Sequence, residues 1–397
     1  MDYTPDHLRA LRDTYRDGLL LDVLPFWTDH CVDHEQGGFV FNLDREGRWI
    51  DTDKAVWIQG RFAWLLATLY RTVEARSQWL DLAAHGVAFL ERHAFDRDGR
   101  MFFQLTRAGQ PLRKRRYIFS EAFATIAFAA YAAASGDDAR AQRARDLFRN
   151  MIELIQTPGR LEPKVNPQTR PQKGLAVPMI LIATAQVLRD TLDDPLARTW
   201  IDRSIEEIAC DFMKPAWQAV LETVGPQGEF IDSFDGRLLN PGHAIEAGWF
   251  VLHEARVRGG DAQLRDLGLQ IVDWSWQWGW DSEYGGMTYF RDVRHLPPTE
   301  YWHDMKFWWP QCEAIIAQLL AWHLTGDPRY AARHQMAHDW AHAHFPDPEH
   351  GEWYGYLHRD GRISTTLKGN LWKGPFHIPR MQWYCWQLLD EVLARPR

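Results

Sequence analysis

The chain has 397 residues, of which 46% are hydrophobic and 25% are charged, and its formal net charge is −8 at pH 7. These proportions are ordinary for a globular protein, and the negative charge argues against a general nucleic-acid binder. No Ser/Gly-rich or charged linker divides the chain, so we predict one domain over residues 1–397. The one dense basic run, Arg113–Arg116, is short and predicts a solvated loop.

The sequence also bears on the compartment in which the protein works. The first residues, MDYTPDHLRALRDTYRDG, contain no basic segment followed by an apolar stretch, so no signal peptide is expected. No apolar run approaches membrane-spanning length. The four cysteines lie far apart without a CxxC pair, which predicts a cytoplasmic protein with free thiols. The 21 tryptophans are compatible either with core packing or with platforms for a sugar ring.

A turn motif recurs along the chain. It reads DHEQGGFVFNLDREG from residue 33, DRDGRMFFQLTRAG from 96, DSEYGGMTYFRDV from 281 and DPEHGEWYGYLHRDG from 347, with a weaker copy, GPQGEFIDSFDG, from 225. An acidic or Gly-rich turn, a short alternating aromatic run and a second turn predict a small β-hairpin in each copy. The copies fit a spacing of about 63 residues. Only the segment expected near residue 159, TPGRLEPKVNPQTRP, has lost the motif.

The segments between the hairpins predict helices. In chain order, WIQGRFAWLLATLYRTVEA, SQWLDLAAHGVAFLERHAF, EAFATIAFAAYAAAS, RDLGLQIVDWSWQWGW and QCEAIIAQLLAWHLTG carry apolar residues three and four positions apart. A unit of about 63 residues holds two ordinary helices and a hairpin. Six units fill nearly the whole chain, so we predict an all-α fold, an (α/α)6 toroid of six helical hairpins with short β-hairpins at one end. An open α-solenoid is the alternative.

One short stretch leads into each predicted inner helix. The stretches are KAVWIQGR (54–61), YIFSEAF (117–123), KGLAVPM (173–179), NPGHAIEAGW (240–249), MKFWWPQCEA (305–314) and KGNLWKGPFHIPR (368–380). Because they recur at the same phase of the repeat, we expect them to meet around one mouth of the ring. They collect aromatic, basic and acidic side chains, which makes this mouth the predicted active site.

Two histidines in these stretches are candidates for acid–base chemistry. His243 and Glu246 stand three residues apart at the start of a predicted helix, so Glu246 is expected to hold the imidazole tautomer. His377 lies just before Pro379 opens the last predicted helix. Their equivalent phases predict that the two imidazoles face each other, and an ordinary pKa of about 6.5 suits proton transfer near neutrality. Taken singly, each histidine is equally compatible with a structural role.

Other residues of the same stretches are expected to bind the substrate. Arg61 can hold a sugar oxygen that gains negative charge, with an ordinary surface salt bridge as the alternative. Glu121 and Lys306 are further candidates, although Glu121 also suits the first turn of a helix. The candidates for stacking on a sugar ring, or alternatively for core packing, are Trp308, Trp309 and Trp372.

The sequence predicts neither a metal nor a cofactor. His338, His342 and His344 cluster in AHDWAHAHF, but no HExxH motif or nearby cysteine joins them, and they fall at the outer end of a unit. Neither GxGxxG nor a Walker loop is present, so nothing indicates a dinucleotide or P-loop site. We therefore expect an enzyme that works without a cofactor.

Several of these segments together resemble the N-acylglucosamine 2-epimerase family. They are QGRFAW, FSEAF, AVPMIL, GRLLNPGHAIEAGW, DSEYGG, MKFWWPQCEA, GEWYGYLHRDG and KGNLWKGPFHIPR, which run from about residue 35 to 380. The resemblance implies the (α/α)6 fold and interconversion of sugars at C2. It also implies that His243 and His377 are the acid–base pair, that Glu246 is the glutamate of the family's GHAIE motif and that Arg61 is the arginine of its QGRF-like motif.

The resemblance is closest to the N-acylglucosamine branch. The cellobiose epimerase and mannose isomerase branches carry a histidine in the third inner helix, where this chain reads GLAVPMIL. The segment KGNLWKGPFH differs from the KGGPFKGCFH of animal epimerases by the addition of Trp372, which bears on the sugar pocket.

We therefore expect a 2-epimerase acting on a free monosaccharide, N-acetylglucosamine or N-acetylmannosamine, with no nucleic-acid or membrane partner and with a homodimer possible. Return of the C2 proton to C1 would instead give a ketose, so a D-mannose to D-fructose isomerase is the first alternative. A glycoside hydrolase that uses Glu121 and Glu246 as its carboxylate pair is another. A non-catalytic sugar- or protein-binding module is the last.

Overall fold

Six helices line the centre of the molecule in the computed structural model, which describes residues 3–114 and 117–394. These inner helices have no polar face, because neighbouring helices and an outer layer cover them on nearly every side. In the fifth of them, every residue from Trp308 to Ala321 is buried. The inner helices are α3 (Val56–Thr72), α5 (Phe119–Ser135), α7 (Ala176–Leu192), α10 (Pro241–Val257), α12 (Trp308–Thr325) and α14 (His377–Ala394).

The outer helices are amphipathic. In α6 the buried residues Ala141, Ala144, Leu147, Met151 and Leu154 recur three or four positions apart, which forms one apolar stripe. The outer helices are α1 (Pro5–Asp17), continued by a π-helical turn (Gly18–Val23) and α2 (Leu24–His30), α4 (Ser77–His93), α6 (Asp138–Gln156), α8 (Ala197–Glu207), continued by a π-helical turn (Ile208–Phe212), α11 (Ala262–Gly279) and α13 (Pro328–His344). The predicted alternation of inner and outer helices is confirmed.

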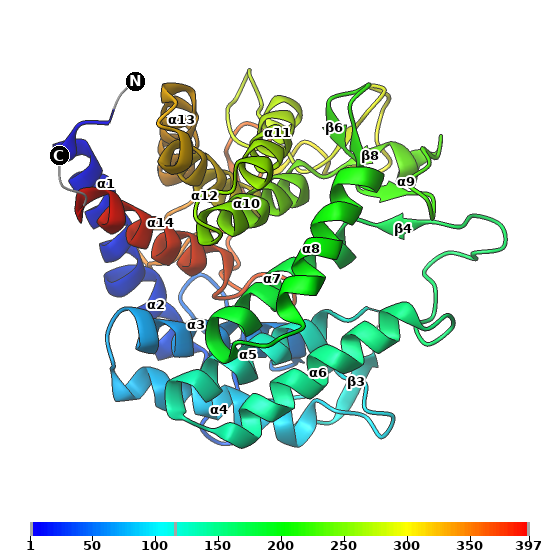
Figure 1. The fold of residues 1–397 in the computed structure, drawn as a ribbon. Coiled ribbons are helices and arrows are strands. Elements are labelled where there is room, and N and C mark those ends of the chain that lie inside the picture. The colour runs from blue at the N-terminus through cyan, green and yellow to red at the C-terminus, as the bar shows by residue number, and fades with distance from the viewer. Residues whose placement is uncertain (1–2, 115–116, 395–397) are drawn as a thin grey trace.

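The two ends of the chain close the ring. Figure 1 shows the first helix, α1, beside the last, α14, and the two pack together. The indole N–H of Trp383 in α14 donates to the Thr72 hydroxyl of α3 at 3.0 Å, which joins the last inner helix to the first. Arg45 pairs with Asp347 at 2.7 Å and links the first hairpin to the last. The (α/α)6 toroid is confirmed, and the open solenoid is excluded by these contacts.

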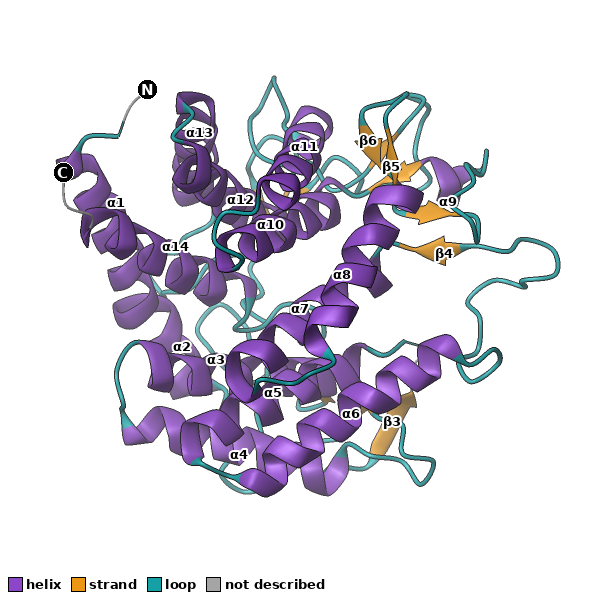
Figure 2. Ribbon diagram, in the orientation of Figure 1, coloured by secondary structure: helices purple, strands orange, loops and turns teal. Residues whose placement is uncertain are grey.

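Short antiparallel strands gather at one side of the helices, and β3 to β6 are seen on the right in Figure 2. A strand that leads into an inner helix pairs with the following hairpin, as Lys54 does with Leu105 and Lys306 with Leu357. The pairs and sheets are β1 (Lys54–Ala55), β2 (Phe102–Leu105) and β3 (Pro111–Lys114); β4 (Lys173–Gly174) and β7 (Thr223–Val224); β5 (Met213–Lys214) and β6 (Ala219–Val220); β8 (Leu238–Leu239) and β9 (Arg291–Asp292); and β10 (Lys306–Phe307), β11 (Tyr356–Leu357) and β12 (Ile363–Thr365).

Three segments depart from a regular hairpin, and the first of them does so as the loss of the turn motif predicted. Residues 157–172 form turns and bends, because four prolines in this stretch prevent a regular ladder. After a turn at 225–229, the weaker copy forms the one-turn helix α9 (Phe234–Arg237), which Ser233 caps. The predicted basic loop begins as the exposed strand β3, which ends at Lys114, while Arg115 and Arg116 lie outside the described residues.

Buried lysines tie the hairpins to the inner helices. Each lysine precedes an inner helix and pairs with the aspartate of a hairpin turn, which also accepts an arginine from a second hairpin. The three sets are Asp33 with Lys54 and Arg107, Asp281 with Lys306 and Arg359, and Asp347 with Lys368 and Arg45. Burial opposes ionisation of these aspartates, but the paired cations hold their pKa values well below the usual range.

No helix among the described residues is long and apolar enough to cross a bilayer. All four cysteines carry free thiols, and three of them, Cys31, Cys312 and Cys385, are buried.

Candidate active site

Two imidazoles enter one mouth of the ring from the first turns of α10 and α14. Asn240 caps α10 by accepting the backbone N–H of His243 at 3.2 Å, and Pro241 begins the helix. His377 begins α14. Both imidazoles lie against the indole of Trp309 in the first turn of α12, with ring centroids 5.1 and 5.7 Å away. One tryptophan thus joins two histidines that are far apart in sequence into a single site.

His243 is held by Glu222, which corrects the prediction that Glu246 holds this ring. The Nδ1 atom of His243 lies 3.0 and 3.1 Å from the two carboxylate oxygens of Glu222. Glu246 is close enough to act on His243 electrostatically, but it accepts its hydrogen bond from Arg380 of α14, at 2.6 Å. A guanidinium is a stronger partner for a buried carboxylate than a neutral imidazole is, so Glu246 turns toward Arg380.

His377 is nearly buried, with 7% of its surface exposed. Its Nδ1 lies 2.7 Å from Oε1 of Glu313, and the same oxygen accepts a hydrogen bond from Arg380 at 2.6 Å. The indole of Trp249 donates to the other oxygen of Glu313 at 2.7 Å. Within the described residues, the Nε2 atoms of His243 and His377 have no hydrogen-bond partner, so these two atoms are left for a substrate.

The surroundings move the pKa values of the two histidines in opposite directions. Burial lowers the pKa of His377 well below 6.5, and the nearby guanidiniums of Arg380 and Arg61 act in the same direction. Burial is the largest cause and disfavours the charged form of His243, but the carboxylates of Glu222, Glu246 and Glu313 act together in the opposite direction, Glu222 most strongly, and the pKa of His243 is raised above 6.5. Two titratable groups whose pKa values are pushed apart supply one proton acceptor and one proton donor.

Arg61 is buried between aromatic rings. Its guanidinium carbon lies 4.1 Å from the ring centroids of Trp57 and Phe123 and 4.6 Å from that of Phe376. No hydrogen bond or ion pair forms on this guanidinium within the described chain, and its Nε is a buried donor without a partner. Burial lowers the pKa of Arg61 to about 9, so the group is still charged at neutral pH. A buried cation of this kind suits an oxygen that develops negative charge, and the surface salt-bridge alternative is wrong.

The three tryptophans expected to stack on sugar occupy different positions. Trp309 lies against both imidazoles, as described above. Trp308 is 3% exposed and therefore packs in the protein interior. Trp372 is 44% exposed, and its ring meets those of Trp57 and Phe103 with centroids 5.7 and 5.8 Å apart. Through Trp57, the exposed tryptophan lies on the Arg61 side of the site.

Glu121 and Lys306 have structural partners, which corrects their assignment to substrate binding. Glu121 is fully buried and accepts hydrogen bonds from Arg100 at 2.7 Å and from the backbone N–H of Met101 at 3.0 Å. Lys306 is fully buried against Asp281. The second carboxylate oxygen of Glu121, Oε2, is buried and has no hydrogen-bond partner among the described residues. Glu121 is paired with Arg100 and Glu246 with Arg380, so each carboxylate of the hydrolase alternative already has a cationic partner.

Comparison with known proteins identifies the family. The profile of the family described as N-acylglucosamine 2-epimerase (GlcNAc 2-epimerase) matches residues 37–378. The chain belongs to the N-acylglucosamine 2-epimerase family. The N-acylglucosamine 2-epimerase of Bos taurus is 37% identical over 411 residues, and the alignment covers 100% of this chain and 95% of that protein. The chain is therefore an isomerase, a sugar 2-epimerase.

Solved structures of the same fold confirm the architecture of this epimerase. The cellobiose 2-epimerase of Bacillus thermoamylovorans B4167 matches with a TM-score of 0.84 at 20% identity, covering 97% of this chain and 100% of that chain. A D-mannose isomerase matches with a TM-score of 0.79 at 18% identity, covering 98% of both chains.

One set of described residues in the epimerase has the spacing of metal ligands. One ligand atom from each of Glu246, Glu313 and His377 lies within 4.8 Å of the others, and all three residues are buried. Nη2 of Arg380 is 2.6 Å from an oxygen of each carboxylate, so a guanidinium supplies the positive charge that a metal ion would bring. That the enzyme needs no metal stays a prediction.

The histidine cluster of α13 packs against α1 instead of entering the active site. The hydroxyl of Tyr15 in α1 lies 2.9 Å from His334 and 2.8 Å from His338. The Nδ1 atoms of His342 and His344 each lie within hydrogen-bond distance of a backbone oxygen one helical turn earlier, at 2.9 and 2.7 Å. The rings of His334, His338 and His342 meet Tyr15 and belong to the interface that closes the toroid, whereas His344 stacks on Trp340 of its own helix.

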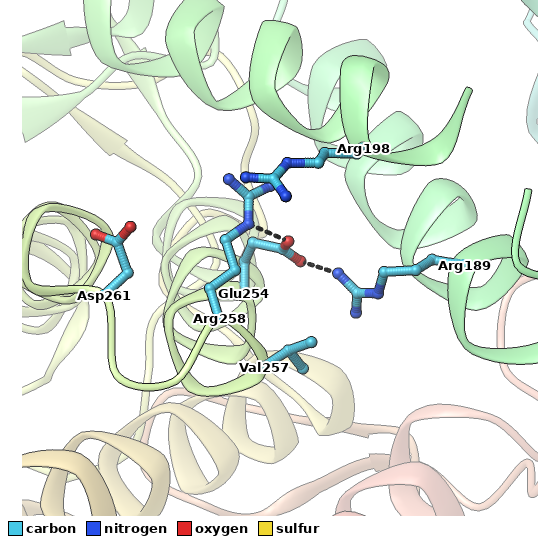
Figure 3. Close-up of a pocket in the computed structure, with 6 residues that line it drawn as sticks. All are labelled: Arg189, Arg198, Glu254, Val257, Arg258 and Asp261. Carbon is cyan, nitrogen blue, oxygen red and sulfur yellow. Dashed lines mark hydrogen bonds and ion pairs between the residues drawn. The ribbon is translucent and has the colours of Figure 1, made fainter. Parts of the chain in front are cut away.

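A second hollow, of about 440 Å³, lies at the opposite end of α10 from His243 (Figure 3). Its centre is Glu254, which is paired with Arg189 and with Arg258. Arg258 also pairs with Asp202 at 2.6 Å. The Glu254 carboxylate of this hollow is compensated by two arginines, and Glu254 lies eleven residues along α10 from His243, or about 16 Å at the rise of an α-helix.

Three residues of the site were not singled out from the sequence. Glu313 and Arg380 lie in the stretches MKFWWPQCEA and KGNLWKGPFHIPR, and a charged residue among apolar helix positions was a usable signal for both. Glu222 lies outside the stretches that lead into the inner helices. Its contact with His243 depends on how β7 pairs with β4, so no local pattern indicates it.

Proposed function

We propose that this epimerase interconverts N-acetylglucosamine and N-acetylmannosamine by exchanging the proton on C2 through His243 and His377. The observation that carries the proposal is the pair of imidazoles against one indole, with pKa values moved in opposite directions. The name of the bovine relative, an N-acylglucosamine 2-epimerase, supports the choice of substrate.

The reaction needs the open-chain sugar, because the free aldehyde acidifies the proton on C2. The neutral histidine takes that proton on its Nε2 and leaves an enolate whose C1 oxygen faces the Arg61 guanidinium. The protonated histidine then gives its Nε2 proton to the opposite face of C2. One proton enters and one leaves the enzyme, so its net charge is unchanged and the product differs only in configuration at C2.

The substituent on C2 decides which products are possible. Return of the proton to C1 gives a ketose only when C2 carries a hydroxyl. An N-acetyl group at that carbon therefore permits epimerisation and blocks ketose formation, whereas D-mannose allows D-fructose to form.

The test is turnover in D2O, followed by NMR and chromatography with N-acetylglucosamine and D-mannose as separate substrates. We expect N-acetylmannosamine that carries deuterium at C2, because the donor's proton exchanges with solvent. The His377→Ala variant should form no epimer while it keeps the wild-type Tm within a few degrees, since Glu313 keeps its bond to Arg380.

Three results would contradict the proposal. An epimer that retains its C2 hydrogen fully would exclude proton exchange at C2. Fructose labelled at C1, with N-acetylglucosamine unchanged, would assign the chain to aldose–ketose isomerisation. No turnover of either sugar would remove the proposed substrates.

Two further expectations stay predictions. We propose a cytoplasmic enzyme, which the four free thiols support. Its partner in the reaction is a free monosaccharide, and a homodimer remains compatible with the sequence.

A further inference from the structure

Glu222 is fixed by its backbone on both sides. Its N–H donates to the carbonyl of Leu238 at 3.1 Å, and its carbonyl accepts from the N–H of Leu175 at 3.0 Å. Leu238 lies just before α10 and Leu175 just before α7, so the residue spans the approaches to two inner helices. A backbone held in this way gives the carboxylate a defined position relative to the mouth.

The carboxylate of Glu222 reaches only one atom of His243. Both of its oxygens lie about Nδ1, at 3.0 and 3.1 Å, and its side chain is 18% exposed. The face of the imidazole lies on Trp309, at an interplanar angle of 36°. The amide nitrogen of Asn240 also lies 3.1 Å from Nδ1, but the two carboxylate oxygens of Glu222 can only accept. A hydrogen on Nδ1 therefore satisfies Glu222, and Nε2 is the atom that can exchange a proton with a sugar.

The carboxylate beside His377 is that of Glu313, and its charge is compensated differently from that of Glu222. Oxygen Oε1 of Glu313 is shared between His377 and Arg380, at 2.7 and 2.6 Å, so a permanent cation already compensates this carboxylate. Glu222 forms its single ion pair with His243, as far as the described residues show. Glu222 thus favours an imidazolium, while the pair of Glu313 and Arg380 favours a neutral imidazole.

From this geometry we infer that Glu222 is a positioning residue that keeps His243 protonated on both ring nitrogens between turnovers. His243 is then the proton donor, and His377 the proton acceptor, when one of the two epimers binds. The inference rests on the proposed epimerisation. The proton removed from C2 goes to Nε2 of His377, and the proton of His243 goes to C2. After turnover His243 takes up a proton from solvent, because the Glu222 carboxylate stabilises its charged form, and His377 releases its proton to solvent.

The different surroundings of His243 and His377 satisfy a requirement of the two-histidine mechanism. Turnover needs one charged and one neutral imidazole at the same pH, whereas two ordinary histidines are both mostly neutral above about pH 7. Two other carboxylates face His243, those of Glu246 and Glu313, and both accept hydrogen bonds from Arg380. The remaining ionisable neighbours are His377 and, next to Glu222, Tyr289. The shift of the pKa of His243 above 6.5 agrees with the geometry.

The experiment is the pH profile of kcat/KM for N-acetylglucosamine in Glu222→Gln. Glutamine keeps a hydrogen-bond acceptor at Nδ1 but removes the charge. The alkaline limb, where His243 loses its proton, should move to lower pH by about one unit or more, while the acid limb of His377 stays in place. KM at the optimum should change little, and Glu222→Asp should keep the alkaline limb within a few tenths of a unit. An alkaline limb in Glu222→Gln equal to that of the wild type would overturn the inference.

The control is Glu229→Gln, seven positions along the chain, whose exposed carboxylate accepts the backbone N–H of Gln227 in its turn. This variant should keep the wild-type profile. A shift of equal size in both variants would show a general effect of net charge, and the inference would then fail.

A second measurement separates this inference from the proposed function. The imidazole of His243 can be titrated by NMR with 15N-labelled histidine, and its signal is assigned from its loss in His243→Ala. We expect the pKa of His243 to fall in Glu222→Gln whether or not the sugar turns over. If the pKa falls but no sugar reacts, the proposed substrate fails and the role of Glu222 stands. If the pKa does not move, Glu222 does not hold the proton.

Discussion

Two buried arginines in the site have opposite environments. Arg380 is 5% exposed and donates to Glu246 and Glu313, so its charge is paired. Arg61 is 8% exposed and has three aromatic rings around its guanidinium, with no carboxylate in hydrogen-bond contact among the described residues. Removing a cation from a buried pair leaves uncompensated charge, whereas removing an unpaired buried cation leaves none. Their roles in stability and in turnover should therefore separate.

We predict that Arg61→Met leaves Tm unchanged or raised while kcat falls by about a hundredfold or more, because the charge that faces the enolate is lost. The matched variant Arg380→Met should lose about 3–5 kcal/mol of stability, since Glu246 and Glu313 remain as buried carboxylates. Thermal unfolding and steady-state kinetics of both variants check this. A drop in the Tm of Arg61→Met as large as that of Arg380→Met would show that Arg61 is a structural cation.

At the scale of the elements, buried ion pairs join each hairpin turn to the entrance of an inner helix, and these pairs stabilise the ring. Lys306 ends fully buried at the entrance to α12, and Asp281, which is 2% exposed, receives both Lys306 and Arg359. Arg359 reaches the same aspartate from the last hairpin but is 38% exposed. Burial makes the lysine the larger contributor to stability, because water screens the arginine.

We predict that Lys306→Met costs about 3 kcal/mol of unfolding free energy and that Arg359→Ala costs about 1 kcal/mol or less. Both variants should keep the wild-type KM in their folded fraction, since neither side chain reaches the imidazoles. Urea unfolding and Michaelis kinetics provide the measurements. A raised KM in Lys306→Met with unchanged unfolding would return this lysine to the substrate-binding set.

For the whole molecule, ring closure depends on an interface that contains buried histidines. Tyr15 of α1 lies within 2.9 Å of His334 and His338 of α13. Burial is the main cause that lowers the pKa of His334 to about 3 and the pKa of His338 still further, with neighbouring histidines adding to it. In the unfolded chain these side chains titrate near 6.5. Between these limits the unfolded state binds more protons than the folded state, so stability is lost as pH falls from about 6.5.

We predict that Tm falls steadily between pH 6.5 and 4.5 and that this slope is shallower in His338→Leu, whatever the absolute Tm of the variant. The control is the exposed His358→Leu, which should keep the wild-type slope. Calorimetry across this pH range decides between the outcomes. Equal slopes in all three proteins would mean that the α1–α13 interface does not titrate during acid unfolding.

Much of the architecture follows from local sequence signals. Apolar periodicity marked the helices, acidic and glycine-rich turns marked the hairpins, and their regular spacing predicted six units. The histidines of the site were predicted from their phase, since an inner helix that follows each hairpin must begin at the same mouth. Where prolines replaced the turn, in residues 157–172, the lost signal corresponded to a lost hairpin.

The partners of those histidines were decided only by the tertiary structure. Spacing on one helix suggested that Glu246 holds His243, but Arg380 arrives from α14 and takes that carboxylate, while Glu222 arrives through a strand pairing. Lys306 and Glu121 likewise looked available until the hairpins supplied buried ion-pair partners. Sequence periodicity determined which residues lie at the mouth, because it follows from backbone geometry. Which charges pair there depends on distances between separate helices, and only the closed ring sets those distances.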